Sequence, residues 1–223
     1  MGSAHPPQTD TPVNDIPATS AEDPARFWDQ RYAEAEYFYG TAPNAWLVTQ
    51  AHRLKPGMRA LSVADGEGRN GVWLAQQGCK VTAVDASPRA QAKAAALAQK
   101  HGVSLTLHTT DLRHWDWPVA AFDVAVAIYG HFRRWDRPVI HRAMLNALVP
   151  GGLILLQAFS PYQKLYQSGG PSDLDMLYSA YRLREDFIDA EILELEEVET
   201  TLDEGRGHRG RAAVTRLVAR RRP

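Results

Sequence analysis

A turn rich in glycine and carboxylate is the clearest chemical signal in the chain. It follows the first expected strand and reads Asp65-Gly66-Glu67-Gly68-Arg69-Asn70-Gly71. Its three glycines satisfy the pattern G-x-G-x-x-G, and Asp85 follows the first of them by 19 positions. This spacing is typical of a dinucleotide-binding turn, in which the backbone approaches a pyrophosphate and the acid binds ribose hydroxyl groups. The pattern alone has little specificity, because Gly205–Gly210 also satisfies it.

The charge of this turn favours a different ligand. A pyrophosphate binds bare N–H groups at a helix N-terminus, whereas Asp65 and Glu67 flank Gly66 and would repel it. Two carboxylates suit a ligand with nearby cationic groups, such as the ammonium and sulfonium of S-adenosylmethionine. Asp85 can bind the ribose of either ligand, so the dinucleotide stays open as an alternative.

Alternating strands and helices must position this turn. Short apolar runs predict strands, and segments of helical period lie between them. The expected strands are Ala60–Ala64, Val81–Val84, Leu105–Leu107, Val124–Ile128 and Leu153–Phe159, and the expected helices are Gly71–Gln77, Pro88–His101 and Pro138–Leu148. The alternation predicts an open α/β fold, a parallel sheet covered on both faces that binds its ligand at strand ends.

The C-terminal part of the chain breaks this alternation. Ile192–Leu202 and Ala212–Arg220 both have the pattern of strands, and Gly205–Gly210 is expected to join them as a hairpin. The first strand is rich in glutamate and the second in arginine, so charges of opposite sign are expected to pair across the hairpin.

Two further segments complete a recognisable order of motifs. Thr110-Asp111-Leu112 follows the third expected strand and places an acid where an adenine amino group can be bound, and Leu148–Gly152 leads from a helix into an apolar strand. With the glycine turn, this order resembles the class I S-adenosylmethionine-dependent methyltransferases from Phe27 to the C-terminus. The resemblance implies a Rossmann-like, doubly wound sheet of seven strands, mostly parallel with an antiparallel last strand, and helices on both faces.

Two N-terminal segments narrow the resemblance. Phe27–Tyr32 and Tyr39–Leu47, together with Gly66–Asn70, are similar to the tellurite-resistance and thiopurine S-methyltransferase-like branch. In that branch N-terminal aromatic residues lie over the bound donor, so residues 26–55 are expected to form a helical cover. The cover residues that the resemblance implies are Trp28, Tyr32, Tyr39, Gly40 and Asn44. Alternatively, Trp28, Tyr32 and Trp46 are core anchors of two helices.

The donor site that the resemblance implies follows the strand ends. It comprises Ala64, Asp65, Gly66, Glu67, Gly68 and Asn70 from the turn, Asp85, Ala86 and Ser87 after the second strand, Asp111 and Leu112 after the third, and Ile128 and Tyr129 at the end of the fourth. Two positions depart from the family pattern, since Ser62 replaces an acid and Ala64 replaces a glycine. The missing acid removes an acceptor for the ammonium group, and Asp65 can supply it from three positions later.

The methyl acceptor is expected beyond the fourth strand, at Ile128–Phe132. This segment lacks the Asn- or Asp-Pro-Pro-aromatic signature that clamps a planar amino nitrogen, which argues against methylation of bases and amides. His131 can accept a proton from a thiol or hydroxyl acceptor, or it can be a buried structural histidine. Further acceptor-binding candidates are Arg133, Tyr162 in the long loop Ser160–Pro171 that is expected to form a lid, and His208 and Arg209 in the hairpin loop.

The composition limits the setting in which this chemistry occurs. The 223 residues fit one domain at residues 26–223 after a proline-rich flexible leader at residues 1–25, with a first helix beginning near Asp23-Pro24. A net charge of -1 gives no bulk attraction for nucleic acid, and the single cysteine, Cys79, allows neither an internal disulfide nor a zinc cluster. No apolar run is long enough to span a membrane. We expect a cytoplasmic monomer or homodimer without a metal site.

The sequence therefore predicts a methyltransferase that uses S-adenosylmethionine. Its expected substrate is a small molecule with a soft nucleophile, such as a thiol or a chalcogen. One alternative is an NAD-dependent oxidoreductase. The other is a non-catalytic protein that binds S-adenosylmethionine, which is suggested by the departures from the family pattern at Ser62 and Ala64.

Overall fold

The computed structural model describes residues 24–223, so the predicted leader up to residue 23 and the expected cap Asp23 lie outside the described residues. The first helix, α1 (Pro24–Arg31), begins at the predicted proline. A short helix, α2 (Ala45–Thr49), follows and continues into a 3-10 helix, η1 (Gln50–Arg53). Asn44 caps α2, because its side-chain oxygen accepts a hydrogen bond from the backbone N–H of Leu47 at 3.0 Å.

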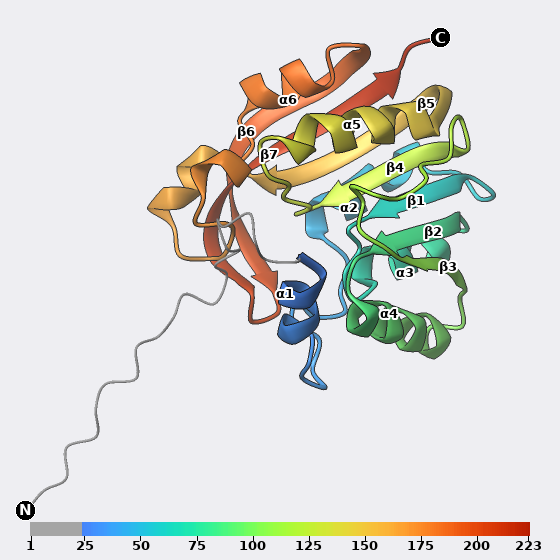
Figure 1. Ribbon diagram of the computed structural model, residues 1–223, viewed down its shortest axis with the longest axis vertical. Helices are drawn as coiled ribbons and strands as arrows, with labels where there is room; N and C mark the ends of the chain where they lie inside the picture. Colours follow the sequence, from blue (N-terminus) through green and yellow to red (C-terminus); the bar gives the residue numbers. More distant parts are fainter. Residues whose placement is uncertain (1–23) are drawn as a thin grey trace, which may run out of the picture.

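Seven strands form one sheet in the order β3-β2-β1-β4-β5-β7-β6 (Figure 1). Their bounds are β1 (Arg59–Val63), β2 (Lys80–Asp85), β3 (Leu105–Thr109), β4 (Phe122–Ile128), β5 (Leu148–Phe159), β6 (Ala190–Glu204) and β7 (His208–Arg221). β1 to β5 pair in parallel, whereas β7 is antiparallel to both of its neighbours, β5 and β6. The predicted mostly parallel sheet with an antiparallel last strand is confirmed.

Both faces of the sheet are buried at its central strands, and neighbouring residues of these strands point into different clusters. Leu61 and Leu156 pack with residues of α5 (Asp136–Ala147) and α6 (Ala180–Asp186), while Leu155 packs on the opposite face with residues of α2 and α3 (Arg69–Gln76). Burial on both faces explains why the strands are continuous apolar runs. The predicted helices on both faces are confirmed.

The remaining helices differ in how well the sequence predicts them. α4 (Pro88–Lys100) has the predicted bounds to within one residue, and its predicted cap Ser87 accepts from the N–H of Ala90 at 3.1 Å. By contrast, α6 was not predicted, because its seven residues bury only Leu183 and carry no repeated apolar pattern. Within residues 24–223, no helix is long and apolar enough to cross a membrane.

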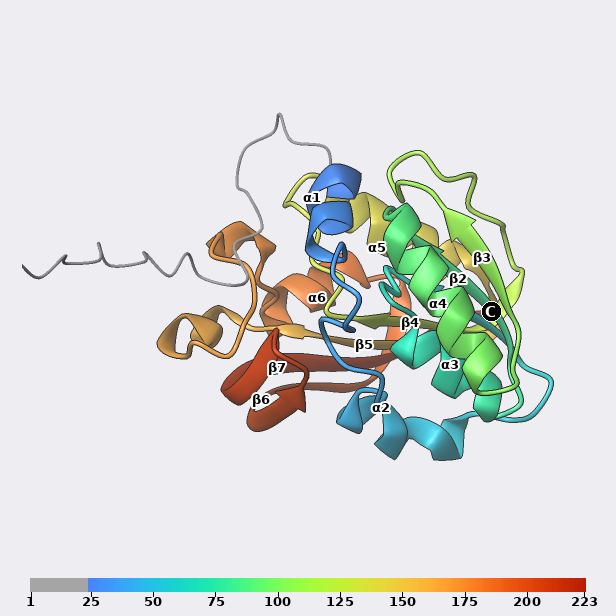
Figure 2. The ribbon, with the colours of Figure 1, turned by 90° about the horizontal axis from the view of Figure 1, so that it is seen from below.

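The C-terminal hairpin carries the expected ion pairs and reaches the N-terminal cover. Arginines on β7 pair with glutamates on β6, as in the exposed Arg211–Glu199 pair at 2.5 Å. At the turn, a Cβ on Gly207 would lie 2.4 Å from the ring of Phe38, so only glycine allows this approach. Figures 1 and 2 show α1 and the chain that follows it at the end of the sheet, close to α4. The cover and the hairpin turn therefore pack together.

The long connection after β5 is anchored at its base. It contains two 3-10 helices, η2 (Pro161–Leu165) and η3 (Leu174–Met176). The buried Gln163 accepts from the N–H of Ala213 on β7 at 2.8 Å and donates to the carbonyl of Gly169 at 2.9 Å. Gly170 and Pro171 at the end of this loop line the cavity described below. Closure of the loop as a lid stays a prediction.

Candidate active site

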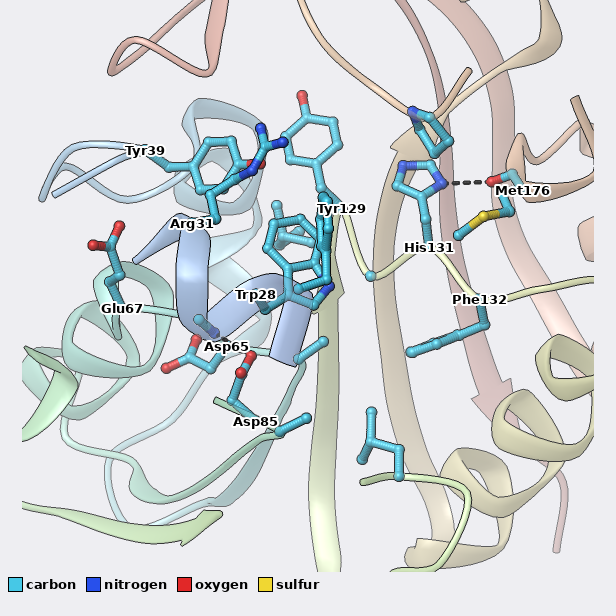
Figure 3. Close-up of a pocket in the computed structure, with 18 of the residues that line it drawn as sticks. Trp28, Arg31, Tyr39, Asp65, Glu67, Asp85, Tyr129, His131, Phe132 and Met176 are labelled. Atoms are coloured by element: carbon cyan, nitrogen blue, oxygen red, sulfur yellow. Dashed lines mark hydrogen bonds between the residues drawn. The ribbon is translucent and has the colours of Figure 1, made fainter. Parts of the chain in front are cut away.

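A cavity lies at the carboxyl ends of β1, β2 and β4, beneath the N-terminal cover (Figure 3). Its lining residues include Trp28, Tyr39, Asp65, Asp85, Asp111, Leu112, Tyr129, His131, Phe132, Phe159, Met176 and His208. Figure 3 shows Asp65, Glu67 and Asp85 on one side and His131, Phe132 and Met176 on the other, with Tyr129 between them. The cavity thus has an acidic side and a mainly apolar side.

Two non-glycine residues of the wall have left-handed backbones. Ala64 follows β1 with φ 52°, and Tyr129 follows β4 with φ 57°. Left-handed conformations cost roughly 1–3 kcal/mol for such residues, and strain of this kind gathers at functional sites. The family pattern has glycine at the position of Ala64, so the alanine keeps the turn geometry at an energetic cost.

Asp85 organises the acidic side from the end of β2. One oxygen, Oδ2, accepts from the N–H of Gly66 at 2.8 Å, and the other, Oδ1, accepts from the N–H of Ser87 at 2.9 Å. Burial raises the pKa of Asp85, and these hydrogen bonds oppose the rise. The backbone N–H of Ala86 is a third donor, and a carboxylate offers about four acceptor positions, so Asp85 can still accept from a hydroxyl group of a ribose. Ser87 itself does not line the cavity.

Asp65 occupies the start of α3. Its Oδ1 accepts from the hydroxyl of Ser62 at 2.6 Å and from the N–H of Gly71 at 3.0 Å. Burial raises the pKa of Asp65 to about 7, against the effect of these two hydrogen bonds, and its Oδ2 is buried without a partner. A helix amide that would meet a pyrophosphate is therefore bonded to a carboxylate, which disfavours a dinucleotide.

Glu67 holds the cover in place. Its Oε2 accepts from the N–H of Phe38 at 2.7 Å, and its Oε1 accepts from the ammonium of Lys93 on α4 at 2.6 Å. Both carboxylate oxygens are thus engaged within the protein, and Lys93 compensates the charge. The side chain also lines the cavity, and its predicted role at the ligand's cationic groups stays a prediction.

A buried cluster on the hairpin side contains Arg69, Asn44, Glu204 and His208, and we call it the cavity cluster. Glu204 accepts from Arg69 at 2.8 Å, from Asn44 at 2.7 Å and from Nδ1 of His208 at 3.3 Å. Burial alone would raise the pKa of Glu204, but His208 and Arg69 hold it at about 2. Burial also lowers the pKa of His208, against the opposing effect of Glu204. The cluster ties α2, α3 and the hairpin together and places His208 in the wall.

His131 has no nitrogen available to a substrate. Its Nδ1 donates to the carbonyl of Met176 at 2.6 Å, and its Nε2 accepts from the N–H of Phe159 at 3.2 Å. Burial lowers the pKa of His131 to about 4, so the ring is neutral at pH 7. The prediction of a general base at His131 is not supported, because the side chain satisfies two backbone groups instead.

Most of the predicted site residues come together around the cavity. The lining includes Trp28, Tyr32, Tyr39, Gly40, Ala64, Asp65, Gly66, Glu67, Asn70, Asp85, Ala86, Asp111, Leu112, Ile128, Tyr129, His131, Arg133 and His208. Gly68, Ser87, Tyr162 and Arg209 do not line it. A Cβ on Gly68 would lie 2.6 Å from Cβ of Ala94, so this glycine permits the approach of α4. The side chains of Tyr162 and Arg209 are exposed, and Asn44 acts through Glu204.

Sequence reasoning missed several lining residues. Phe27, Arg31, Arg69, Phe159 and Met176 all contribute to the wall. Arg69 lies inside the glycine turn and begins α3, and its place in that turn is a signal that was available. Phe159 ends an expected strand, which is also a signal, whereas Met176 lies in a connection with no regular pattern.

The comparisons with known proteins agree with this geometry. Residues 60–152 match a family model described as a methyltransferase domain. No curated protein sequence matches the chain.

Three solved structures illustrate the likeness. A protein studied for the conversion of a disulfide bond into a thioacetal group during echinomycin biosynthesis has a TM-score of 0.73 at 20% identity, covering 89% of this chain and 92% of that one. The [4+2]-cyclase SpnF has a TM-score of 0.68 at 18% sequence identity, and the match covers 94% of this chain and 99% of that one. TehB from Haemophilus influenzae has a TM-score of 0.66 at 20% sequence identity, and the match covers 89% of this chain and 67% of that one.

The chain has the fold of class I S-adenosylmethionine-dependent methyltransferases, and the match at residues 60–152 indicates S-adenosylmethionine as the cofactor. The residues present fit this cofactor. Asp85 lines the cavity at the end of β2, Asp65 carries a buried oxygen without a partner, and the other oxygen of Asp65 accepts from a helix amide that a pyrophosphate would otherwise meet.

Proposed function

We propose that the protein transfers a methyl group from S-adenosylmethionine to a small molecule with a soft nucleophile, such as a thiol or a chalcogen. The observation that carries the proposal is the cavity itself, which has carboxylates at the strand ends on one side and an apolar wall on the other. The cofactor, when bound, supplies an activated methyl group. The protein's residues bind and orient the two reactants and exclude water, which are the main requirements of an in-line displacement.

The branch of the family belongs to the same proposal. The aromatic cover of Trp28, Tyr32 and Tyr39 and the likeness to TehB support the tellurite-resistance and thiopurine S-methyltransferase-like branch. Tyr32 lies over the glycine turn, since a Cβ on Gly66 would be 3.0 Å from its hydroxyl oxygen. A cover of this kind supports a small acceptor in preference to a polymer.

An acceptor screen tests the proposal. Thiols, thiopurines, phenols, tellurite, selenite and halide ions are incubated with S-adenosylmethionine, and release of S-adenosylhomocysteine is measured. We expect turnover with at least one thiol or chalcogen. Binding of the donor without turnover of any acceptor would favour a non-catalytic S-adenosylmethionine-binding protein.

A further inference from the structure

His208 is a buried titratable group in the cavity wall that the proposed function leaves without a role. Its side chain is 3% exposed and lines the cavity together with Tyr39, Tyr129 and Phe159. The ring centroid lies 4.4 Å from those of Tyr39 and Tyr129 and 5.1 Å from that of Phe159. Aromatic packing on three sides fixes the orientation of the imidazole.

The cavity cluster fixes the protonation of this ring. Glu204 is ionised and can only accept hydrogen bonds, so Nδ1 of His208 carries the proton that it donates. Arg69 and Asn44 hold the carboxylate from its other sides. In the neutral ring, Nε2 is therefore the unprotonated nitrogen with a free lone pair.

This Nε2 differs from every comparable nitrogen nearby. Within residues 24–223 it has no hydrogen-bond partner. It is also not one of the unpartnered polar atoms that are closed off in the interior. In His131 both nitrogens are bonded to backbone groups. His141 forms a similar arrangement with Asp186 and Arg137, which we call the core cluster, but its Nε2 is sealed in the interior. Of these three histidines, only His208 presents an open lone pair.

The groups around His208 allow it to take up a proton. The charged or titratable side chains that face it are Glu204 on β6, Arg69 on α3, Tyr39 on the cover, Tyr129 on β4 and the neutral His131. Arg69 disfavours an imidazolium, whereas Glu204 is hydrogen-bonded to it and carries the compensating charge. Burial keeps the pKa of His208 below its ordinary value, so the ring is neutral and basic at pH 7.

The other residues of the cavity wall indicate which kind of acceptor the cavity can hold. Phe132, Ile140, Phe159, Pro171 and Met176 give the cavity lining an apolar part, to which Arg133 and Asp136 add charged side chains. An apolar wall suits an organic body and disfavours a small hydrated oxyanion, because no water replaces the lost hydration.

We propose that His208 is the general base of the transferase, and that the acceptor is an apolar organic molecule with a protonated thiol or hydroxyl group. This inference rests on the proposed methyl transfer. The S–H or O–H proton of the acceptor passes to Nε2 of His208, and the freed lone pair forms a bond to the methyl carbon. The bond from that carbon to the donor sulfur breaks, and its electron pair stays on the sulfur of S-adenosylhomocysteine. The proton later leaves to solvent.

The test compares His208→Gln with the wild type on a series of substituted thiophenols, alkyl thiols and phenols at pH 7. For acceptors that are protonated at this pH, we expect kcat/KM to fall by about 10²- to 10⁴-fold, which is the usual contribution of a general base. For acceptors already ionised at pH 7, we expect a much smaller loss. A loss of the same size across the whole series would overturn the proposal. Arg211→Gln, an exposed change on the same strand, serves as the matched control.

A second measurement keeps the two proposals separable. If the wild type methylates no acceptor, the proposed function fails, and the ring nitrogens of His208 are then observed directly by nitrogen NMR. We expect the Nδ1–H tautomer at pH 7, in which Nε2 carries no proton. Nε2 should take up a proton only below pH 6.5. An Nε2–H tautomer would exclude the base whatever the enzyme's activity. If instead the wild type is active and the loss does not depend on acceptor acidity, only the role of His208 fails.

Discussion

The cavity cluster and the core cluster each join a histidine, a carboxylate and an arginine, in different surroundings, and the cavity cluster adds Asn44. In each, a carboxylate accepts from a histidine Nδ1 and from an arginine, with His–carboxylate distances of 3.3 and 2.8 Å and Arg–carboxylate distances of 2.8 and 2.6 Å respectively. The cavity cluster lies under the cover, whereas the core cluster joins α5 to the end of α6. Their composition alone would assign them the same role.

Access to the second ring nitrogen separates the two. In the core cluster, the ring of His141 stacks on Phe187 at 4.9 Å and is fully buried, so its Nε2 meets neither water nor ligand. The open Nε2 of the cavity cluster can exchange a proton with a bound molecule. A His–carboxylate–Arg cluster is therefore chemical or structural according to what its outer nitrogen faces.

Breaking the core cluster gives the largest expected effect on stability. Asp186→Asn leaves the buried guanidinium of Arg137 without its charge partner, and removing one member of a buried pair costs about 3–5 kcal/mol. We expect the free energy of unfolding in urea to fall by that amount, while kcat of the folded fraction stays unchanged. A loss of activity per folded molecule would show that the core cluster contributes to the chemistry.

Breaking the cavity cluster at its carboxylate is expected to change the pH profile. Glu204 raises the pKa of His208, so Glu204→Gln lowers that pKa further and moves the acidic limb of kcat/KM to lower pH. A weaker base also transfers protons less effectively, and we expect kcat/KM to fall about 10- to 100-fold. Glu199→Gln, on the same strand but exposed, is the control. An unmoved acidic limb would contradict the link between Glu204 and His208.

The buried histidines predict how stability depends on pH. Burial lowers the folded-state pKa of His141 below 6.5, so the unfolded chain binds more protons in acid. Its contribution is complete above pH 6.5 and is lost as pH falls through the folded pKa, at up to about 1.4 kcal/mol per pH unit. His141→Gln should flatten the stability curve below pH 6.5. An unchanged slope would mean that His141 is not held neutral.

The smallest effect is expected at an exposed pair outside both clusters. Arg211 and Glu199 lie on the solvent side of the hairpin, where water and salt screen their attraction. Glu199→Gln should leave the urea midpoint and the kinetic pH profile unchanged. A clear shift in the urea midpoint or in the kinetic pH profile would show that exposed charges on the hairpin, and not only the buried clusters, determine that property.

Much of the fold could be predicted because its signals are local. Apolar runs and the Ser87 cap marked the strands and α4, and the glycine turn marked the donor side of the cavity. The acceptor side depends on contacts between distant residues, which a single sequence does not reveal. His131 lies near a strand end, where catalytic residues are often found. Its two ring nitrogens are nevertheless hydrogen-bonded to backbone groups of Met176 and Phe159, which lie 45 and 28 positions away in the sequence. Glu204 and Arg69 are separated by 135 positions, so the cavity cluster had no local pattern.

A calorimetric titration with S-adenosylhomocysteine tests the central claim most directly. The wild type should bind it with a one-to-one stoichiometry and should not bind NADH. Asp85→Asn should weaken the binding at least tenfold, because a ribose hydroxyl loses its charged acceptor at the end of β2. Asp123→Asn, which removes an exposed carboxylate paired with Arg59 on the same sheet, should bind like the wild type. Binding of NADH without binding of S-adenosylhomocysteine would contradict the account.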